Sequence, residues 1–363
     1  MKVIKEGSVR VDLVGGTLDL QPIALILKDV VTINMATTLK AKVELETIED
    51  RNILEIYSAD YQKPYQYHSH DFKDDNFYKD GALSAHFFKE MLFVILLCKS
   101  LECTQGIKIT LSSGAPTGSG LGGSSAMGIT LVQAILAFKN QSMNKNSIME
   151  HVRKIEELML DRGVAGYQDY FPALYGGVLA LRPGILEHNV EQYYTEALAS
   201  FLETHLVLVY SGQTRNSGIN NWNVFKNFFD HNESTNLQST RKGLVEIAKV
   251  SFEAYQYLRK KEYSKILTCI AREGKIREKL FPGIMTEEMK KIDATCRERF
   301  SSYQGIKVCG AGGGGCFLLV GVTVQEVESL LSQENMKILT LKIDFPLSDE
   351  SLHGMKSEKV SSV

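Results

Sequence analysis

The chain has 363 residues, of which 44% are hydrophobic and 23% charged, and its formal net charge is −2. These values are typical of a folded globular protein, and the nearly neutral charge gives no reason to expect nucleic acid or an anionic membrane surface as a partner. The length suits two domains of ordinary size or one large one.

The sequence carries no targeting or membrane signal that we can identify. Its first thirteen residues, MKVIKEGSVRVDL, alternate apolar and polar side chains and lack the apolar core of a signal peptide. The longest apolar run, MLFVILLC at residues 91–98, is too short to span a bilayer and indicates the buried face of a helix over residues 84–100. The six cysteines are scattered without a CxxC pair, so we expect reduced thiols in a cytoplasmic protein.

The first half of the chain alternates between strand and helix patterns. Two-residue alternation with β-branched side chains predicts strands at residues 9–14, 30–43, 52–58, 106–112 and 177–181. Helices are predicted at residues 124–139 and 147–160. Residues 62–80 are polar and aromatic without a period, and we interpret them as a loop whose HSHD segment is solvated rather than metal-binding.

The second half begins with a buried strand, HLVLVY, at residues 205–210. Residues 220–299 are mostly helical in pattern, and the strand-rich end comprises strands at 306–309, 316–321 and 337–343 and a helix at 324–332. We therefore predict an α+β protein with an N-terminal domain over residues 1–200, a C-terminal domain over 201–347 and a mobile tail over 348–363.

One glycine-rich stretch, GAPTGSGLGGSSAMG at residues 114–128, is typical of a phosphate-binding loop. It satisfies GxGxxG, but no acidic residue follows at the distance that a dinucleotide fold needs for the ribose. Ser124 stands where a P-loop has lysine, and Ser125 where a protein kinase has valine. A helix that begins near Ser124 would offer free N–H groups to a phosphate. A plain strand–turn–helix joint capped by Ser124 or Ser125 stays open as the alternative.

Four segments in order resemble the signatures of the GHMP kinases. PTGSGLGGSS at residues 116–125 resembles the second signature, VRVDLVGGTLDL at 9–20 the sugar-kinase first signature, AGYQDYFPALYGG at 165–177 the segment with the catalytic aspartate, and KVCGAGGGGCF at 307–317 the third signature. The resemblance implies a two-domain α+β fold, with an N-terminal domain like ribosomal protein S5 domain 2 and a ferredoxin-like C-terminal domain.

Two further segments narrow the resemblance to one branch. LVYSGQTRNS at residues 208–217 and LFPGIM at 280–285 are similar to segments of the D-glycero-D-manno-heptose 7-phosphate kinases and L-fucokinases, which phosphorylate an anomeric hydroxyl. The GEH-type turn with which mevalonate kinases start is absent. Leu18 is a departure, because these families usually have threonine before the aspartate of the first signature.

The resemblance also assigns roles. Asp169 would orient the attacking hydroxyl and accept its proton, and Arg10 would offset charge on the transferred phosphoryl group. Mg²⁺ would bind Ser124 and Glu157, with Ser125 and Glu156 as the alternatives. Residues expected to bind ATP are Pro116, Gly118, Ser119, Gly120, Leu121, Gly122, Gly123, Ser124 and Ser125. Residues expected to bind the sugar are Asp19, Gly166, Asp169, Arg215, Gly312 and Gly313.

The expected function is therefore ATP-dependent transfer of a phosphoryl group to a sugar hydroxyl, most simply the anomeric one of a heptose phosphate or of a hexose such as fucose. The partner would be a small sugar or sugar phosphate, and the protein a monomer or homodimer in the cytoplasm without nucleic acid or membrane. The alternatives are a sugar and ATP sensor without turnover, a galactokinase-like enzyme and, as a minor option, a decarboxylase of the same superfamily.

Overall fold

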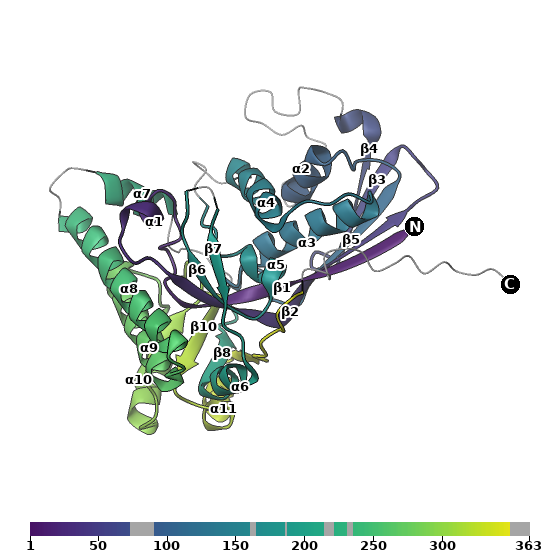
Figure 1. Ribbon diagram of the computed structural model, residues 1–363. Helices are drawn as coiled ribbons and strands as arrows, with labels where there is room; N and C mark the ends of the chain where they lie inside the picture. Colours follow the sequence, from purple (N-terminus) through teal and green to yellow (C-terminus); the bar gives the residue numbers. More distant parts are fainter. Residues whose placement is uncertain (73–90, 160–164, 186, 214–220, 231–234, 349–363) are drawn as a thin grey trace.

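The computed structural model describes residues 1–72, 91–159, 165–185, 187–213, 221–230 and 235–348, which form two β-sheets covered by helices (Figure 1). The predicted tail therefore lies almost entirely outside the described residues. Among the described residues, no helix has both the length and the apolar character needed to cross a membrane.

The first sheet is built around the long strands β1 (Lys2–Val14) and β2 (Thr32–Thr47), which pair antiparallel. The remaining strands follow in the order β4-β3-β5-β2-β6-β7, with β1 paired to β2 off this path. Their bounds are Ile53–Ser58 for β3, Lys63–His68 for β4, Ile107–Ser113 for β5, Val178–Arg182 for β6 and Asn189–Gln192 for β7.

Strand β4 corrects the prediction of a loop at residues 62–80. Tyr65 and Tyr67 are both buried, and their neighbours are exposed. This polar stretch therefore has the two-residue alternation of a strand, with the two tyrosines as its buried residues. The HSHD segment is the end of β4 and a short 3-10 helix at Ser69–Phe72. Strand β7 and the short helix α1 (Ile23–Ile26) were not predicted either, because each has only four residues.

Helices cover one face of this sheet, with α3 at the centre of the layer (Figure 1). Their bounds are Leu92–Ser100 for α2, Gly123–Phe138 for α3, Lys145–Met159 for α4 and Phe171–Tyr175 for α5. Helix α3 packs directly on β1 and β2. Gly7 of β1 allows this approach, because a Cβ there would lie 2.3 Å from Oγ1 of Thr130. The start of α3 is thereby held beside β1.

The second sheet has the strand order β11-β8-β10-β9, and its pairs are all antiparallel. In chain order the strands are β8 (Leu206–Tyr210), β9 (Gly305–Val308), β10 (Cys316–Val320) and β11 (Lys337–Leu339). Helices separate the first strand from the second and the third from the fourth, which is the ferredoxin-like arrangement. The expected α+β fold with a ferredoxin-like second part is confirmed.

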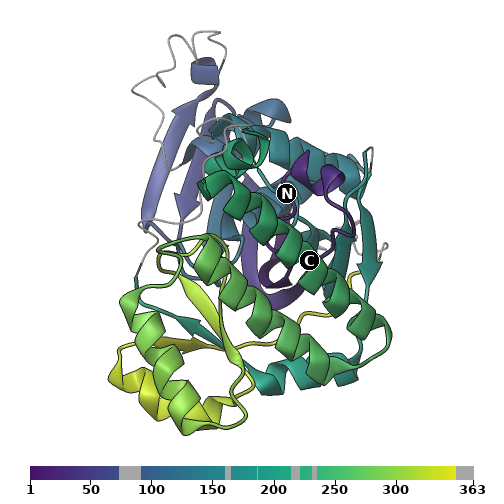
Figure 2. The ribbon, with the colours of Figure 1, turned by 90° about the vertical axis from the view of Figure 1, so that its left-hand side faces the viewer.

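The helices of this part are α6 (Glu196–His205), α7 (Asn221–Phe229), α8 (Thr235–Arg259), α9 (Tyr263–Leu280), α10 (Glu287–Arg299) and α11 (Val324–Gln333). Helices α10 and α11 lie at one end of the molecule in both views, with β3 and β4 at the other (Figures 1 and 2). Helix α6 was not predicted. Helix α6 includes residue 200, near which we expect the domain boundary. The position of that boundary stays a prediction.

The last described segment returns to the first sheet. Thr38 donates its backbone N–H to the carbonyl of Lys342 at 2.9 Å, and Asp344 donates to the carbonyl of Ala36 at 2.9 Å. The Asp344 carboxylate also pairs with Lys40 of β2. Residues 342–347 therefore form a strap from the second sheet to the first.

Candidate active site

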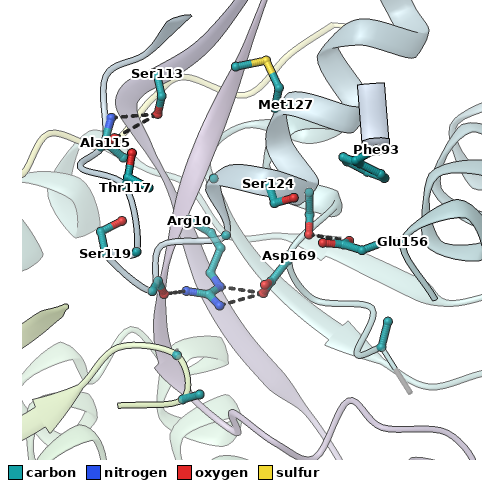
Figure 3. A pocket seen from close by; sticks show the side chains of 18 of the residues that line it. Arg10, Phe93, Ser113, Ala115, Thr117, Ser119, Ser124, Met127, Glu156 and Asp169 are labelled. Carbon is teal, nitrogen blue, oxygen red and sulfur yellow. Dashed lines mark hydrogen bonds and ion pairs between the residues drawn. The ribbon is translucent and has the colours of Figure 1, made fainter. Parts of the chain in front are cut away.

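A cavity of about 990 Å³ lies where the two parts meet, and most of the predicted site residues line it (Figure 3). The predicted residues that line it are Arg10, Asp19, Pro116, Gly118, Ser119, Gly120, Gly122, Gly123, Ser124, Ser125, Gly166 and Asp169. Of the others, Leu121, Glu157, Gly312 and Gly313 do not line it, and Arg215 lies outside the described residues.

The glycine loop is shaped by close approach on two sides. Gly120 and Gly122 have positive φ, +78° and +70°, which favours glycine. A Cβ on Gly120 would lie 2.6 Å from the carbonyl oxygen of Cys309, and one on Gly122 would lie 3.3 Å from the Asp169 side chain. The glycine loop is thus fixed between Asp169 and the third glycine-rich segment, which is the KVCGAGGGGCF stretch at residues 307–317. The loop leads into the start of α3, which faces the cavity. Free N–H groups at such a helix start attract anions.

Leu121 is fully buried, and only its backbone takes part in the site. Its carbonyl accepts a hydrogen bond from the backbone N–H of Arg10 at 3.0 Å. The side chain of Leu121 does not line the cavity, and the prediction that this residue binds ATP stays a prediction for its backbone alone.

Arg10 joins the glycine loop to Asp169. Its Nε and Nη2 atoms lie 2.8 and 2.7 Å from one Asp169 carboxylate oxygen, and its Nη1 donates to the Gly120 carbonyl at 2.5 Å (Figure 3). Arg10 is buried, whereas 30% of the Asp169 side chain is exposed to the cavity. Burial lowers the pKa of Arg10, but Asp169 and Asp12 outweigh it, so the guanidinium stays charged.

Glu156, rather than Glu157, is the glutamate of α4 at the cavity. Its carboxylate accepts hydrogen bonds from Ser125 Oγ at 2.9 Å and from the Tyr170 hydroxyl at 2.8 Å. Burial raises its pKa, against the effect of these two hydrogen bonds. Glu157 instead pairs with Arg153, one turn earlier on the helix, at 2.6 Å. The prediction of Glu157 as a metal ligand is therefore corrected, because one helical step turns its side chain away.

Asp19 is a buried carboxylate at the cavity wall, only 4% exposed. It accepts a hydrogen bond from the backbone N–H of Gln168 at 3.1 Å. Gly166 leaves space for the Asp19 carboxylate, since a Cβ atom on Gly166 would lie 2.0 Å from Asp19 Oδ2. Burial and the nearby Asp169 raise the pKa of Asp19 to about 6. Leu18, the departure in the first signature, is fully buried and does not line the cavity.

The third glycine-rich segment reaches the cavity through Gly310 and Ala311. A Cβ on Gly312 would lie 2.4 Å from the Ile284 side chain, and Gly313 donates its N–H to the Ile284 carbonyl at 3.0 Å. Gly312 and Gly313 thus pack against the loop before α10 and do not line the cavity, and their predicted contact with substrate stays a prediction.

Four buried charges were not predicted as site residues, and two of them, Asp12 and Arg277, line the cavity. Lys307 Nζ lies 2.9 Å from Glu273 and 3.2 Å from Asp12, and it donates to the Leu13 carbonyl at 2.9 Å. Arg277 lies 3.5 Å from Asp12 and donates to the Gly310 carbonyl at 2.5 Å. Burial alone would raise the pKa of Asp12, but Lys307, Arg277 and Arg10 hold it below its ordinary value.

This ion cluster (Asp12, Glu273, Arg277 and Lys307) connects β1 to α9 and β9. Glu273 also accepts the backbone N–H of Gly15 at 2.5 Å, which fixes the turn that leads to Asp19. A signal for it exists in the sequence, because Glu273 and Arg277 follow Ile266 and Ile270 on the buried stripe of α9.

One end of the cavity lies near α2 and the turn after β3 and includes several apolar side chains. Met127 and Phe93 lie beyond Ser124, away from Asp169 (Figure 3). Met91 and Tyr61 also line this end. We refer to it as the α2 end. The opposite end, which contains Asp19 and Gly166, is the α1 end.

Comparison with known proteins gives one domain match and several similar proteins. Residues 86–177 match the family described as the GHMP kinases N terminal domain. A bifunctional fucokinase/GDP-fucose pyrophosphorylase of Arabidopsis thaliana is 28% identical over 89% of this chain, which spans only 30% of that relative's length. A mevalonate kinase of Methanocaldococcus jannaschii is 26% identical over 86% of this chain and 92% of its own.

Among solved structures, the galactokinase of Lactococcus lactis bound to galactose superimposes with a TM-score of 0.72 over 95% of both chains. At 14% identity, this likeness concerns the fold alone. The matched N-terminal domain, the shared fold and the four signatures in order all indicate similarity to the GHMP kinases. Residues 86–177 are thus similar to the N-terminal domain of the GHMP kinases, and the chain shares the fold of the galactokinase.

Proposed function

We propose that this protein is an ATP-dependent kinase that phosphorylates a sugar hydroxyl. The observation that carries the proposal is the contact chain from the glycine loop through Arg10 to Asp169, at the start of α3. The residues at the start of α3, Arg10 and Asp169 line one cavity, which supports an anion-binding role for that helix start beside a fixed cation and a carboxylate. Transfer of a phosphoryl group needs these groups to be held in a fixed arrangement around the phosphate.

In the proposed reaction, the acceptor hydroxyl oxygen attacks the γ-phosphorus of ATP, its proton passes to the Asp169 carboxylate, and ADP leaves. Arg10 holds Asp169 through Nε and Nη2 and offers positive charge near the transferred group. The N–H groups at the start of α3 bind the phosphates. Because the transition state is loose, positioning and charge matter more than the basicity of Asp169.

Magnesium fits this cavity as the partner of ATP. The described lining residues include five carboxylates (Asp12, Asp19, Asp60, Glu156 and Asp169) but only two cations, Arg10 and Arg277. The phosphates of ATP would therefore meet a surplus of negative charge. Glu156 and the hydroxyls of Ser124 and Ser125 provide hard oxygen ligands at the start of α3, as Mg²⁺ prefers. When bound, Mg²⁺ would neutralise phosphate charge.

The same charges favour an uncharged acceptor. Both lining arginines already pair with lining carboxylates, Arg10 with Asp169 and Arg277 with Asp12. Asp19 can accept hydrogen bonds from a pair of sugar hydroxyls. A neutral hexose such as fucose therefore suits the described cavity better than a heptose phosphate or a carboxylic acid. Following the similarity to the fucokinases, we propose the anomeric hydroxyl as the acceptor.

A panel assay tests this function. ADP release with Mg-ATP is measured against free hexoses, sugar phosphates and mevalonate. We expect turnover with a neutral sugar. The competing proposal, a sensor without turnover, predicts sugar-dependent ATP binding and no ADP release with any of these compounds. It is disfavoured because Asp169, Ser124 and Glu156 all remain in the cavity.

The two neighbouring glutamates of α4 provide a matched pair of variants. Glu156→Gln should lower kcat/KM for Mg-ATP by about 10²-fold, because a hard anionic ligand is lost. Glu157→Gln should change it less than about twofold, because Glu157 pairs only with Arg153 at the side of the helix. Initial rates measured across a Mg²⁺ titration give kcat/KM for Mg-ATP in both variants. Equal losses in the two variants would remove the metal role from Glu156.

Sugar binding should depend on the protonation of Asp19. Its pKa is raised to about 6, so the carboxylate is ionised above that pH and protonated below it. The affinity for the sugar should therefore fall as the pH drops through 6, by up to about tenfold per unit. Calorimetry without nucleotide measures this, so ATP protonation does not enter. The Asp19→Asn variant should bind weakly and with no such step; an identical step in that variant would contradict the assignment.

A further inference from the structure

Two consecutive residues just before α5 contact two different parts of the proposed site. Asp169 pairs with Arg10 beside the glycine loop. Its neighbour Tyr170 instead donates its hydroxyl to Oε2 of Glu156 on α4, at 2.8 Å. Tyr170 is one of the residues that line the cavity, yet it is only 1% exposed, so the surrounding residues hold its ring in place. The proposed reaction uses Asp169 and Glu156 but not the tyrosine that connects them.

The hydrogen bonds to the Glu156 carboxylate converge on one of its two oxygens. Ser125 Oγ donates to Oε2 at 2.9 Å, and the Tyr170 hydroxyl donates to the same atom at 2.8 Å. Two donors from different elements, α3 and the segment before α5, fix the orientation of the carboxylate. Its second oxygen, Oε1, is left by these two donors as a hard ligand for a cation. Carboxylates that bind metals are commonly oriented in this way by neighbouring donors.

The geometry also indicates how Tyr170 takes part. Its one hydroxyl proton is given to Glu156, so the hydroxyl has no second proton to donate to the acceptor or to a phosphate. A buried tyrosine hydroxyl needs a partner in any case, and a purely structural role is the alternative. Tyr303 has such a role, because its hydroxyl donates to Asp293 Oδ1 at 2.7 Å and it is not among the described residues that line the cavity. The two tyrosines therefore form a matched pair for experiment.

We infer that Tyr170 is a positioning residue that fixes the Glu156 carboxylate for Mg²⁺ and connects the metal ligand to the segment that carries Asp169. The inference rests on the proposed function and extends it to a residue that acts through Glu156. Without the hydroxyl, Ser125 alone would hold the carboxylate, and Glu156 would gain rotational freedom. The loss should therefore appear where the metal takes part, and not in the binding of metal-free ATP.

Calorimetry of ATP binding in Mg²⁺ and in EDTA tests the inference without turnover, because no sugar is present. Tyr170→Phe removes the hydroxyl and keeps the ring. We expect the affinity for Mg-ATP to fall about tenfold, the low end of the range for groups that orient a metal ligand. The affinity for metal-free ATP should stay within about twofold, as should the affinity for sugar at the α1 end. Tyr303→Phe loses a comparable hydrogen bond and should leave all three affinities unchanged.

A double-mutant cycle shows whether Tyr170 acts through Glu156. The affinity for Mg-ATP is measured for Tyr170→Phe, for Glu156→Gln and for the two changes combined. The combined variant should bind Mg-ATP no more weakly than Glu156→Gln, because the carboxylate that the tyrosine positions is already gone. A further loss of full size in the combined variant would overturn the inference. Equal losses for ATP with and without Mg²⁺ in Tyr170→Phe would overturn it as well, because the residue would then act on the shape of the cavity.

The failures of the two proposals are distinguishable. If the wild type phosphorylates a sugar and Glu156→Gln weakens Mg-ATP binding, but Tyr170→Phe does not, the inference is wrong and the kinase proposal stands. If Mg²⁺ does not strengthen ATP binding in the wild type, the inference fails whatever the sugar assay shows. If Tyr170→Phe weakens only Mg-ATP binding and no sugar is phosphorylated, the sugar-kinase proposal fails and the positioning role of Tyr170 stands.

Discussion

Replacing Asp169 by asparagine should reduce kcat for phosphoryl transfer by about 10³-fold, the range expected when a positioned proton acceptor is lost. Asparagine keeps the size of the side chain but cannot accept the proton. Arg10 would also lose its ionic partner, since its Nε and Nη2 both contact the same Asp169 oxygen. Single-turnover formation of the sugar phosphate measures the chemical step without product release.

ATP binding provides the control for this variant. The glycine loop and the start of α3 do not depend on the Asp169 charge for their shape, because Gly120 and Gly122 are fixed by close packing. The affinity for ATP should therefore persist, or increase slightly, because Arg10 gains free charge beside the phosphates. A variant that binds ATP normally and turns over within threefold of the wild type would exclude Asp169 as the proton acceptor.

The largest expected effect on stability comes from Lys307→Met. Lys307 is fully buried and its ammonium contacts Asp12, Glu273 and the Leu13 carbonyl. Methionine fills the space but leaves two buried carboxylates to share Arg277. Removing one partner of a buried ion pair costs about 3–5 kcal/mol, and we expect a loss of this size in the free energy of unfolding. Urea denaturation followed by circular dichroism measures it.

An exposed lysine in a similar-looking pair is the matched control. Lys290 lies 2.7 Å from Glu287, but both side chains are largely exposed, so Lys290→Met should leave the denaturation curve unchanged. Similar losses in the two variants would mean that the ion cluster contributes no more than a surface pair. The Lys307 variant should also bind sugar more weakly, since Glu273 holds the turn before Asp19 through the Gly15 N–H.

The sequence predicts the fold of this chain well where a period runs over many residues. Strand β5 and helices α3, α4 and α11 lie within about two residues of their predicted positions, because each has a long buried stripe. Strand β1 was predicted only from residue 9 and begins at Lys2, and β2 was predicted to end at residue 43 and continues to Thr47. Strand β4 was missed because only Tyr65 and Tyr67 carry its alternation. Elements of four residues, such as α1 and β7, contain less than two periods and cannot be identified from pattern.

The candidate site was predictable in part. The glycine loop, Arg10, Asp19 and Asp169 were found through the resemblance, and the structure brings them to one cavity. The choice between Glu156 and Glu157 could have been made from the helix period, because Glu156 falls four residues after the buried Val152. Of the ion cluster, the burial of Glu273 and Arg277 has a signal in the helix period. Their pairing with Asp12 and Lys307 has none, since these residues are brought together only by contacts between distant parts of the chain.

The strap at residues 342–347 has a consequence for how the chain is completed during synthesis. Its backbone pairs with β2 at Ala36 and Thr38, and Leu347 donates to the carbonyl of Tyr175 at 2.8 Å. A sheet whose edge contacts come from the last described residues cannot finish while the ribosome still holds them. The N-terminal half therefore emerges long before its final hydrogen bonds exist, and it reaches its native state only after residues 342–347 have also emerged.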